Sequence, residues 1–201
     1  MKSIDIKGEL RSEFGKKCAK QFRQNNLIPC VLYGVDKDEK GLPVAIPFSV
    51  TVESVRNLIY SPDIFVVNLT VGNNTVKAVL KEIQFHPVKD NILHMDFYQV
   101  TDNKPIVMEV PVKLTGLAAG VKAGGKLTQI LRRVKAKAIY TDIPEFIPLD
   151  VTNLNIGKTI KVGEISYDKL ELVNPKNTVV CSVMVTRTTK ATNETEEQSA
   201  S

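Results

Sequence analysis

The sequence predicts a mainly β protein built from two β-rich units and a short polar tail. Runs rich in Val, Ile and Leu, broken by Gly, Pro and Asn, recur along most of the 201 residues. Helical periodicity is found in only two places, both in the first third of the chain. With 43% apolar residues, a chain of this length can bury the core of one large domain or of two small ones.

The first predicted unit covers residues 1–100. Its six strands are expected at residues 4–10, 28–35, 44–48, 64–71, 75–84 and 92–99. Gly72-Asn73-Asn74 supplies a hairpin turn between two of them. Thr51 is a favourable N-cap, and helically spaced apolar residues follow it: Val52, Val55, Leu58 and Ile59. These features predict a compact unit that also holds one short amphipathic helix here and a second in the basic segment described below.

The second predicted unit covers residues 101–187 and begins at the polar turn Thr101–Pro105. Its strands are expected at residues 106–114, 134–140 and 178–187, with shorter ones near 148–151, 159–162 and 170–173. Residues 188–201 contain no large apolar side chain and carry one Lys against three Glu. They predict a disordered acidic tail.

The charge distribution favours a polyanionic partner. The net charge is +5, and residues 1–35 alone carry seven Lys or Arg against three acidic residues.

No apolar run is long enough to cross a membrane, and the N-terminus lacks the apolar segment of a signal peptide. Cys18, Cys30 and Cys181 lack metal-ligand spacing and are expected to be reduced thiols in a cytoplasmic protein. We therefore expect no metal, cofactor or membrane partner.

A basic segment between Arg11 and Gly34 is the first candidate site. It predicts a helix with cations on one face, at Lys16, Lys20 and Arg23, and small or apolar residues on the other, at Cys18, Ala19 and Phe22. Such a row of cations suits a phosphate backbone. An ordinary basic surface helix explains the same pattern, and charge alone leaves both interpretations open.

A polar strand face is the second candidate site. His94, Asp96 and Tyr98 alternate with Leu93, Met95 and Phe97, so the two sets should point to opposite sides. The polar side could contact an irregular RNA groove, form a metal or acid–base site together with His86, or simply face solvent. The metal interpretation is the weakest, because the chain has only two histidines.

Two further motifs are weaker indications of function. The segment Gly120–Lys126 approaches a phosphate-binding loop, but Leu127 stands where the loop needs Ser or Thr, so a glycine-rich surface loop is expected and nucleotide hydrolysis is rejected. The cluster Arg132–Lys137 could contact phosphates, although a solvated basic sheet face is the favoured interpretation. No nucleophile signature is found, and no catalytic residue is predicted.

Two blocks in the first unit have a specific order and spacing. One comprises Arg11, Gly15-Lys16, Lys20, Arg23 and the segment Pro29-Cys30-Val31-Leu32-Tyr33-Gly34, and the other comprises His86-Pro87 and His94-Met95-Asp96-Phe97. The second half adds Val110–Gly116, Gly120–Gly125, Ile143-Pro144 and Leu154–Gly157. In these blocks the chain resembles the bacterial large-subunit ribosomal protein twenty-five family, in its longer CTC (general stress protein) form. The resemblance covers nearly all of the chain before the tail.

The resemblance implies an N-terminal β-barrel with short helices that binds 5S ribosomal RNA at its loop E region, and a second, CTC-type β-rich domain. Carried over by residue, it implies phosphate contacts from Arg11, Lys16, Lys20 and Arg23. It implies that Tyr33 packs against the RNA and that His94 and Asp96 hydrogen-bond to non-standard base pairs. The protein would then be a structural constituent of the large ribosomal subunit in the cytoplasm, monomeric when free, with neighbouring ribosomal RNA and proteins as further partners.

Two departures and two alternatives accompany this resemblance. The family often has arginine where this chain has Lys20 and Gln21, which puts affinity in doubt, because lysine lacks the guanidinium fork and glutamine lacks the charge. The barrel fold is also shared with the anticodon-binding part of a glutamine-tRNA synthetase, so fold alone does not identify the RNA. The alternatives are a stress-induced RNA-binding factor that is not stoichiometric on ribosomes, and a small metal-dependent hydrolase that uses His86, His94 and Asp96.

Overall fold

The computed structural model describes residues 1–34, 44–167 and 169–186, and the chain divides into two compact units. The N-terminal unit comprises residues 1–106 together with the segment Ile139–Thr141, and the C-terminal unit comprises residues 107–138 and those from Asp142 onward. The acidic tail predicted at residues 188–201 lies outside the described residues, as does the end of the strand predicted at 28–35.

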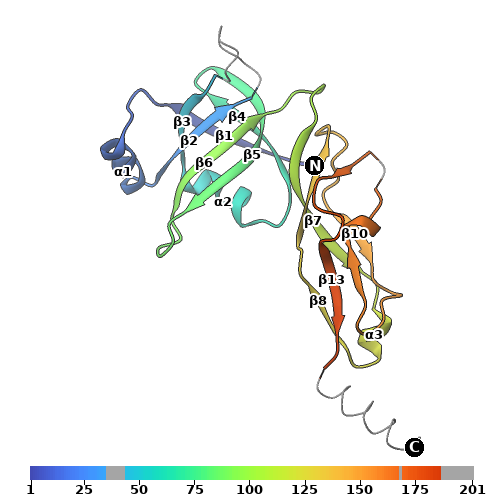
Figure 1. Cartoon of the computed structure of the whole chain (residues 1–201). Helices are drawn as coiled ribbons and strands as arrows, with labels where there is room; N and C mark the ends of the chain where they lie inside the picture. The colour runs from blue at the N-terminus through green and yellow to red at the C-terminus, as the bar shows by residue number, and fades with distance from the viewer. Residues whose placement is uncertain (35–43, 168, 187–201) are drawn as a thin grey trace, which may run out of the picture. The chain divides into compact units, whose positions relative to one another are not determined.

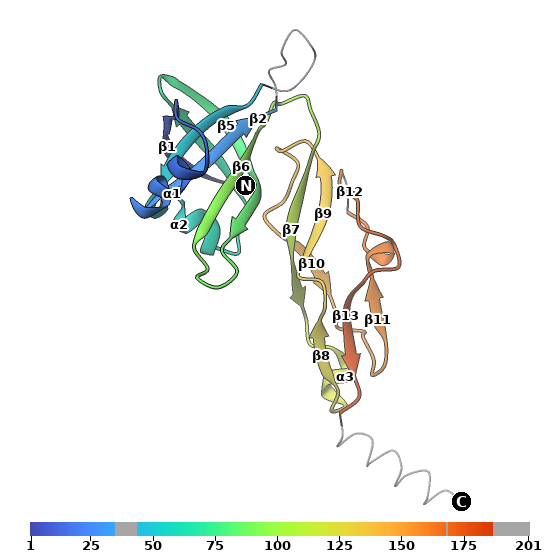
Figure 2. The ribbon, with the colours of Figure 1, turned by 60° about the vertical axis from the view of Figure 1, so that its left-hand side comes forward.

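The N-terminal unit is a closed six-stranded barrel with the strand order β1-β3-β2-β6-β5-β4 (Figures 1 and 2). The strands are β1 Lys2–Leu10, β2 Leu27–Tyr33, β3 Ile46–Thr51, β4 Phe65–Val71, β5 Asn74–Phe85 and β6 Ile92–Gln99. Every predicted strand overlaps one of them. The pairs β1–β4 and β2–β6 are parallel, and the other neighbours are antiparallel. These pairings close the sheet, so no strand edge is left open.

The barrel core is filled by the inward half of each alternating strand. Phe48 and Phe97 are completely buried, and their ring centroids lie 5.6 Å apart. Gly8 makes room for this pair, because a Cβ added at Gly8 would approach the ring of Phe48 to 2.6 Å. Ile6, Met95 and Leu69 complete the centre of the same cluster. The period-two pattern of the sequence thus becomes one continuous apolar interior.

Two helices join the barrel strands. Helix α1 (Lys16–Gln24) follows Gly15, and Asn26 at φ +58 turns the chain from the end of this helix into β2. Helix α2 (Val52–Tyr60) begins after Thr51 as predicted, but the Thr51 side chain makes no capping bond. The Ser54 hydroxyl instead donates to the Thr51 carbonyl at 2.8 Å. Val52, predicted to face inward, is exposed, and the helix packs through residues such as Val55.

The C-terminal unit consists of two small sheets, with the strand orders β10-β7-β9-β12 and β11-β13-β8. Its strands are β7 Ile106–Thr115, β8 Lys126–Gln129, β9 Arg133–Ala138, β10 Ile147–Asp150, β11 Thr159–Lys161, β12 Glu171–Leu172 and β13 Val179–Met184. Strand β8, the short helix α3 (Ala119–Lys122) and a 3₁₀ turn (Val162–Glu164) have no counterpart in the sequence prediction. The mainly β fold class, with a barrel and a second β-rich domain, is confirmed.

The glycine-rich segment after β7 is largely exposed, as the sequence predicts, but it begins in a helix and not in a loop. Gly120 lies in α3 and is buried, and the Gly125 N–H donates to the Gly120 carbonyl at 2.8 Å. A Cβ at Gly120 would come within 2.7 Å of the Ile156 nitrogen, and one at Gly125 within 2.7 Å of a Val183 methyl group. These glycines therefore allow close packing of backbone against β13, which is a structural role.

The three cysteines are free thiols, as expected. Cys30 on β2 and Cys181 on β13 are buried, whereas Cys18 on α1 is partly buried. Burial raises the pKa of the Cys30 thiol and that of Cys181. Both buried thiols thus stay protonated at neutral pH and pack as small apolar side chains. Among the described residues, no helix is both long and apolar enough to span a bilayer.

Candidate nucleic-acid interface

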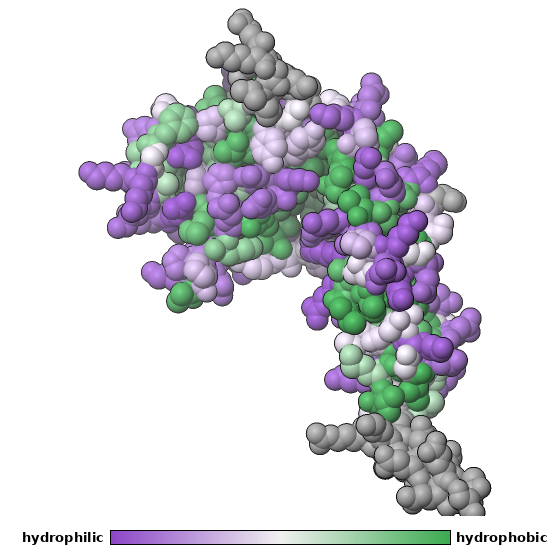
Figure 3. Space-filling model, viewed as in Figure 1, coloured by the Kyte–Doolittle hydropathy of each residue, from purple (hydrophilic) through white to green (hydrophobic). Residues whose placement is uncertain are grey.

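Helix α1 has the two faces that the sequence predicts. Its exposed positions include Lys16, Lys20 and Arg23, and its partly buried positions are Cys18, Ala19 and Phe22. The helix packs beside β2, and hydrophilic side chains surround it in the space-filling view (Figure 3). Neither Lys16 nor Lys20 forms an ion pair with any residue that the structure describes. Their charges are therefore available to an external anion.

Arg11 is placed differently from these lysines. Its guanidinium lies 4.7 Å from the centroid of the Phe22 ring, and one of its nitrogens donates to the Glu13 carbonyl at 3.2 Å. The Arg11 side chain therefore braces the segment after β1 against helix α1. Its Nε is buried and has no partner among the described residues. The Arg11 side chain is only partly exposed, unlike those of Lys16 and Lys20.

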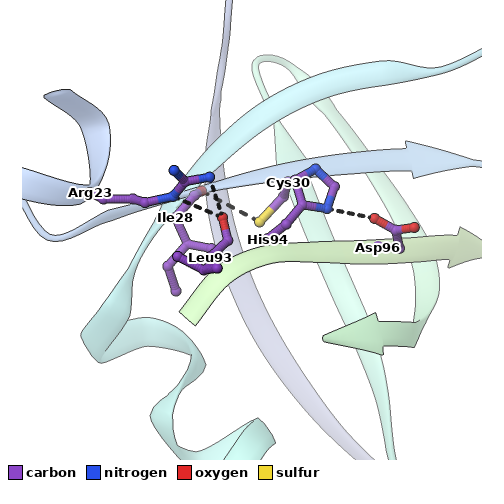
Figure 4. Close-up of polar contacts among 6 residues, drawn as sticks. All are labelled: Arg23, Ile28, Cys30, Leu93, His94 and Asp96. Carbon is purple, nitrogen blue, oxygen red and sulfur yellow. Dashed lines mark hydrogen bonds and ion pairs between the residues drawn. The ribbon is translucent and has the colours of Figure 1, made fainter. Parts of the chain in front are cut away.

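Arg23 reaches from α1 to the start of β6. Its Nε and one terminal nitrogen both donate to the Leu93 carbonyl, at 3.1 and 3.0 Å (Figure 4). The two residues are 70 positions apart in the sequence. This contact brings the cationic helix next to the strand that carries His94 and Asp96, so the two predicted sites adjoin each other.

His94 and Asp96 lie on the outer face of β6, as the alternation predicts. The Nδ1 atom of His94 is 2.8 Å from a carboxylate oxygen of Asp96, and about a quarter of each side chain is exposed, 28% in both cases. A hydrogen bond to the carboxylate places a proton on Nδ1. The Nε2 atom of the neutral ring is then an acceptor, and protonation converts it into a donor.

The neighbouring strand β5 contributes two further polar residues to this outer face. Glu82 pairs with Asp96, and Gln84 pairs with His94. The register shifts between Leu80 and Glu82, which brings Glu82 opposite Asp96. Sequence reasoning missed this contribution, because a strand pattern does not reveal the partner strand or a bulge within it.

Tyr33 pairs with a second tyrosine at the other end of this face. It lies opposite Tyr98 in the parallel β2–β6 register, and the two rings meet edge to face with centroids 5.8 Å apart. Burial, assisted by the carboxylates of Asp96 and Glu82, raises the pKa of the Tyr33 hydroxyl. The hydroxyl therefore remains a neutral donor and acceptor at physiological pH. Tyr98 belongs to the polar strand face that the sequence predicts, and the structure places it beside Tyr33.

His86 does not join this site as a metal ligand. It begins the turn between β5 and β6, and its Nδ1 accepts the backbone N–H groups of Val88 and Lys89, both at 3.2 Å. Within the described ranges, no three His, Cys, Asp or Glu side chains are grouped to hold a metal ion. The structure therefore does not assemble the His86, His94 and Asp96 site that a hydrolase would need.

The second basic cluster lies on β9 in the C-terminal unit. Arg133, Lys135 and Lys137 are exposed, and the residues between them are buried. The Lys137 ammonium forms an ion pair with Glu171 of β12 at 3.1 Å. The strand thus has the solvated basic face and apolar inner face that the sequence predicts.

Family comparisons cover both halves of the chain. The model of the ribosomal L25p family matches residues 6–97, and the model of the C-terminal domain of ribosomal protein TL5 matches residues 105–187. The large ribosomal subunit protein bL25 of Phocaeicola vulgatus is 60% identical over 187 residues, which are 93% of this chain and 94% of that protein. The protein of the same name from Porphyromonas gingivalis is 56% identical over 188 residues, covering 93% and 95%.

A further relative gives the same result. The large ribosomal subunit protein bL25 of Azobacteroides pseudotrichonymphae is 49% identical over 192 residues, which cover 96% of this chain and 98% of that protein. These matches confirm the resemblance noted in the sequence, and the hydrolase alternative is wrong because the family consists of structural, non-enzymatic ribosomal proteins. The chain belongs to the ribosomal L25p family, in the form whose second half is a TL5-type C-terminal domain.

Proposed function

We propose that the N-terminal unit binds 5S ribosomal RNA in its loop E region, as a structural constituent of the large ribosomal subunit in the bacterial cytoplasm. The observation that carries this proposal is the junction between α1 and β6. There an exposed row of cations adjoins the His94–Asp96 pair, held together by the contact of Arg23 with the Leu93 carbonyl. The cations supply phosphate neutralisation, and the pair supplies donors and acceptors for bases.

The charge of the strand face favours base edges over the phosphate backbone. Asp96 and Glu82 lie opposite each other on this face, and two carboxylates repel phosphates. A carboxylate is instead a good acceptor for the exocyclic amino groups of bases. The Nε2 atom of His94 can pair with a 2′-hydroxyl or a base nitrogen. Helix α1 is then the phosphate-binding part of the surface, and β6 the part that reads bases.

An irregular RNA loop fits these two parts better than a regular duplex. In a regular A-form helix the major groove is too deep and narrow for side chains, and the shallow minor groove offers few sequence-specific contacts. Non-standard base pairs expose base edges that His94 and Asp96 could reach. Tyr33 and Tyr98 extend the same face with two aromatic side chains. The C-terminal unit is proposed to contact neighbouring ribosomal RNA or ribosomal proteins.

Lysine-to-alanine variants of α1 test the phosphate-binding part. Lys16→Ala and Lys20→Ala are each expected to weaken 5S RNA binding and to reduce the slope of log K against log salt by about 1, because each lysine contacts one phosphate. The slope is measured by titrating 5S RNA at several salt concentrations. Lys158→Ala removes an exposed charge from the C-terminal unit and should leave the slope unchanged. Unchanged slopes for both helix variants would remove α1 from the interface.

A further inference from the structure

Arg23 is bound to the barrel as well as exposed to solvent. Its guanidinium uses two nitrogens on one acceptor, the carbonyl of Leu93, which immediately precedes His94 in β6 (Figure 4). A guanidinium carries five N–H groups, so this contact leaves three for another partner. The residue is thus both a cation of the α1 row and a connection to the strand.

The acceptor of this contact lies in a β-bulge. The β5–β6 register passes from Gln84 opposite His94 to Phe85 opposite Ile92, so Leu93 has no partner on β5. On the other side of β6, the ladder with β2 begins only at Met95. An extra bulge residue is left out of the ladder, and its peptide groups need other partners. Arg23 supplies one for the Leu93 carbonyl.

The bulge also explains why one expected inward residue does not belong to the core. Leu93 was predicted to point inward with Met95 and Phe97, but it is only partly buried, and Ile92 occupies the core position instead. The bulge therefore ends the regular alternation directly before His94. Bulges beside binding sites commonly redirect side chains in this way.

We propose that Arg23 is a positioning residue. Its two hydrogen bonds to the Leu93 carbonyl hold the bulge in one conformation and thereby fix His94 relative to the cations of α1. This inference rests on the proposed RNA-binding function and assigns two separate contributions to Arg23. The charge of Arg23 contributes to affinity for any RNA, whereas its fork on the Leu93 carbonyl contributes to selectivity for the irregular loop. A lysine at position 23 would keep the charge but could not place two donors on that carbonyl in the same fixed geometry.

The variant Arg23→Lys separates these two contributions. We expect it to keep the wild-type salt slope, because one positive charge remains. It should lose on the order of tenfold in the ratio of 5S RNA binding to plain duplex binding, the equivalent of one hydrogen bond to a charged group. Arg56→Lys, the same exchange at an exposed position of α2 outside the proposed surface, is the matched control and should leave the ratio unchanged.

A double-mutant cycle with His94→Ala tests whether Arg23 acts through His94. If it does, Arg23→Lys should reduce selectivity further by little or nothing once His94 is absent. Losses that multiply in the double variant would contradict the positioning role, as would an Arg23→Lys variant with wild-type selectivity. A wild-type chain without preference for 5S RNA would overturn the proposed function itself, which distinguishes the two failures.

The free protein provides a second readout that needs no RNA. The chain has only two histidines, so the imidazole resonances of His94 and His86 can be compared within one NMR spectrum. Arg23→Lys is expected to shift or broaden the His94 signals and to leave those of His86 unchanged, since His86 is held by the turn that it begins. Unchanged His94 signals would contradict the proposed positioning of His94 by Arg23.

Discussion

Replacing His94 with alanine is expected to lower the preference for 5S RNA over a plain duplex by about tenfold to a hundredfold, equivalent to about 1–3 kcal/mol for a lost base-reading contact. The physical reason is the geometry of the His94–Asp96 pair. With Nδ1 held at 2.8 Å from the carboxylate, the ring presents Nε2 outward in a fixed orientation. Alanine removes this group and also leaves the Asp96 carboxylate without its intramolecular partner.

The measurement compares the binding of the full chain to 5S RNA and to a regular hairpin at one salt concentration. The salt slope should stay near that of the wild type, because no phosphate contact is lost. His86→Ala is the matched control, since it removes the other histidine of the chain from a turn outside the proposed surface. An equal loss of binding to both RNAs would show that His94 does not read the irregular loop.

Replacing Phe97 with alanine should have the largest effect on stability. We expect the free energy of unfolding of the barrel to fall by about 3–5 kcal/mol, the range measured for removal of a buried aromatic side chain. Phe97 is completely buried against Phe48, and it lies on β6 between Asp96 and Tyr98. The variant therefore also loosens the strand on which the proposed site depends.

Chemical denaturation of the chain, followed through its tyrosines because it has no tryptophan, measures this loss. Phe85→Ala removes the same side chain from the end of β5, where the residue is 43% exposed, and should cost about 1 kcal/mol or less. A cost for Phe97→Ala as small as that for Phe85→Ala would contradict the packing of the barrel core described above.

The alternation of apolar and polar residues was sufficient to predict the barrel strands and the outward direction of His94 and Asp96. It works because a strand that is buried on one side has a strict period of two. The same rule failed at Leu93, where a bulge adds one residue to β6. A bulge depends on how two strands pair, and the sequence of one strand does not contain that information.

Long-range contacts were the other feature that the sequence could not provide. The amphipathic spacing of α1 correctly separated Lys16 and Lys20 from Phe22, because helix faces follow from local geometry. The contact between Arg23 and the Leu93 carbonyl depends on the folded barrel. For the same reason Gly120 was assigned to a surface loop: its burial results from residues of the 155–156 segment and of β13, which are distant in the sequence.

Titration of the wild-type chain with 5S RNA and with an unrelated duplex hairpin, each at two salt concentrations, tests whether the protein recognises 5S RNA specifically. We expect tighter binding to 5S RNA at both salt concentrations, together with a loss of affinity for each RNA as salt rises. Equal binding to the two RNAs, or binding to neither, would contradict the assignment of α1 and the outer face of β6 as a 5S RNA-binding surface.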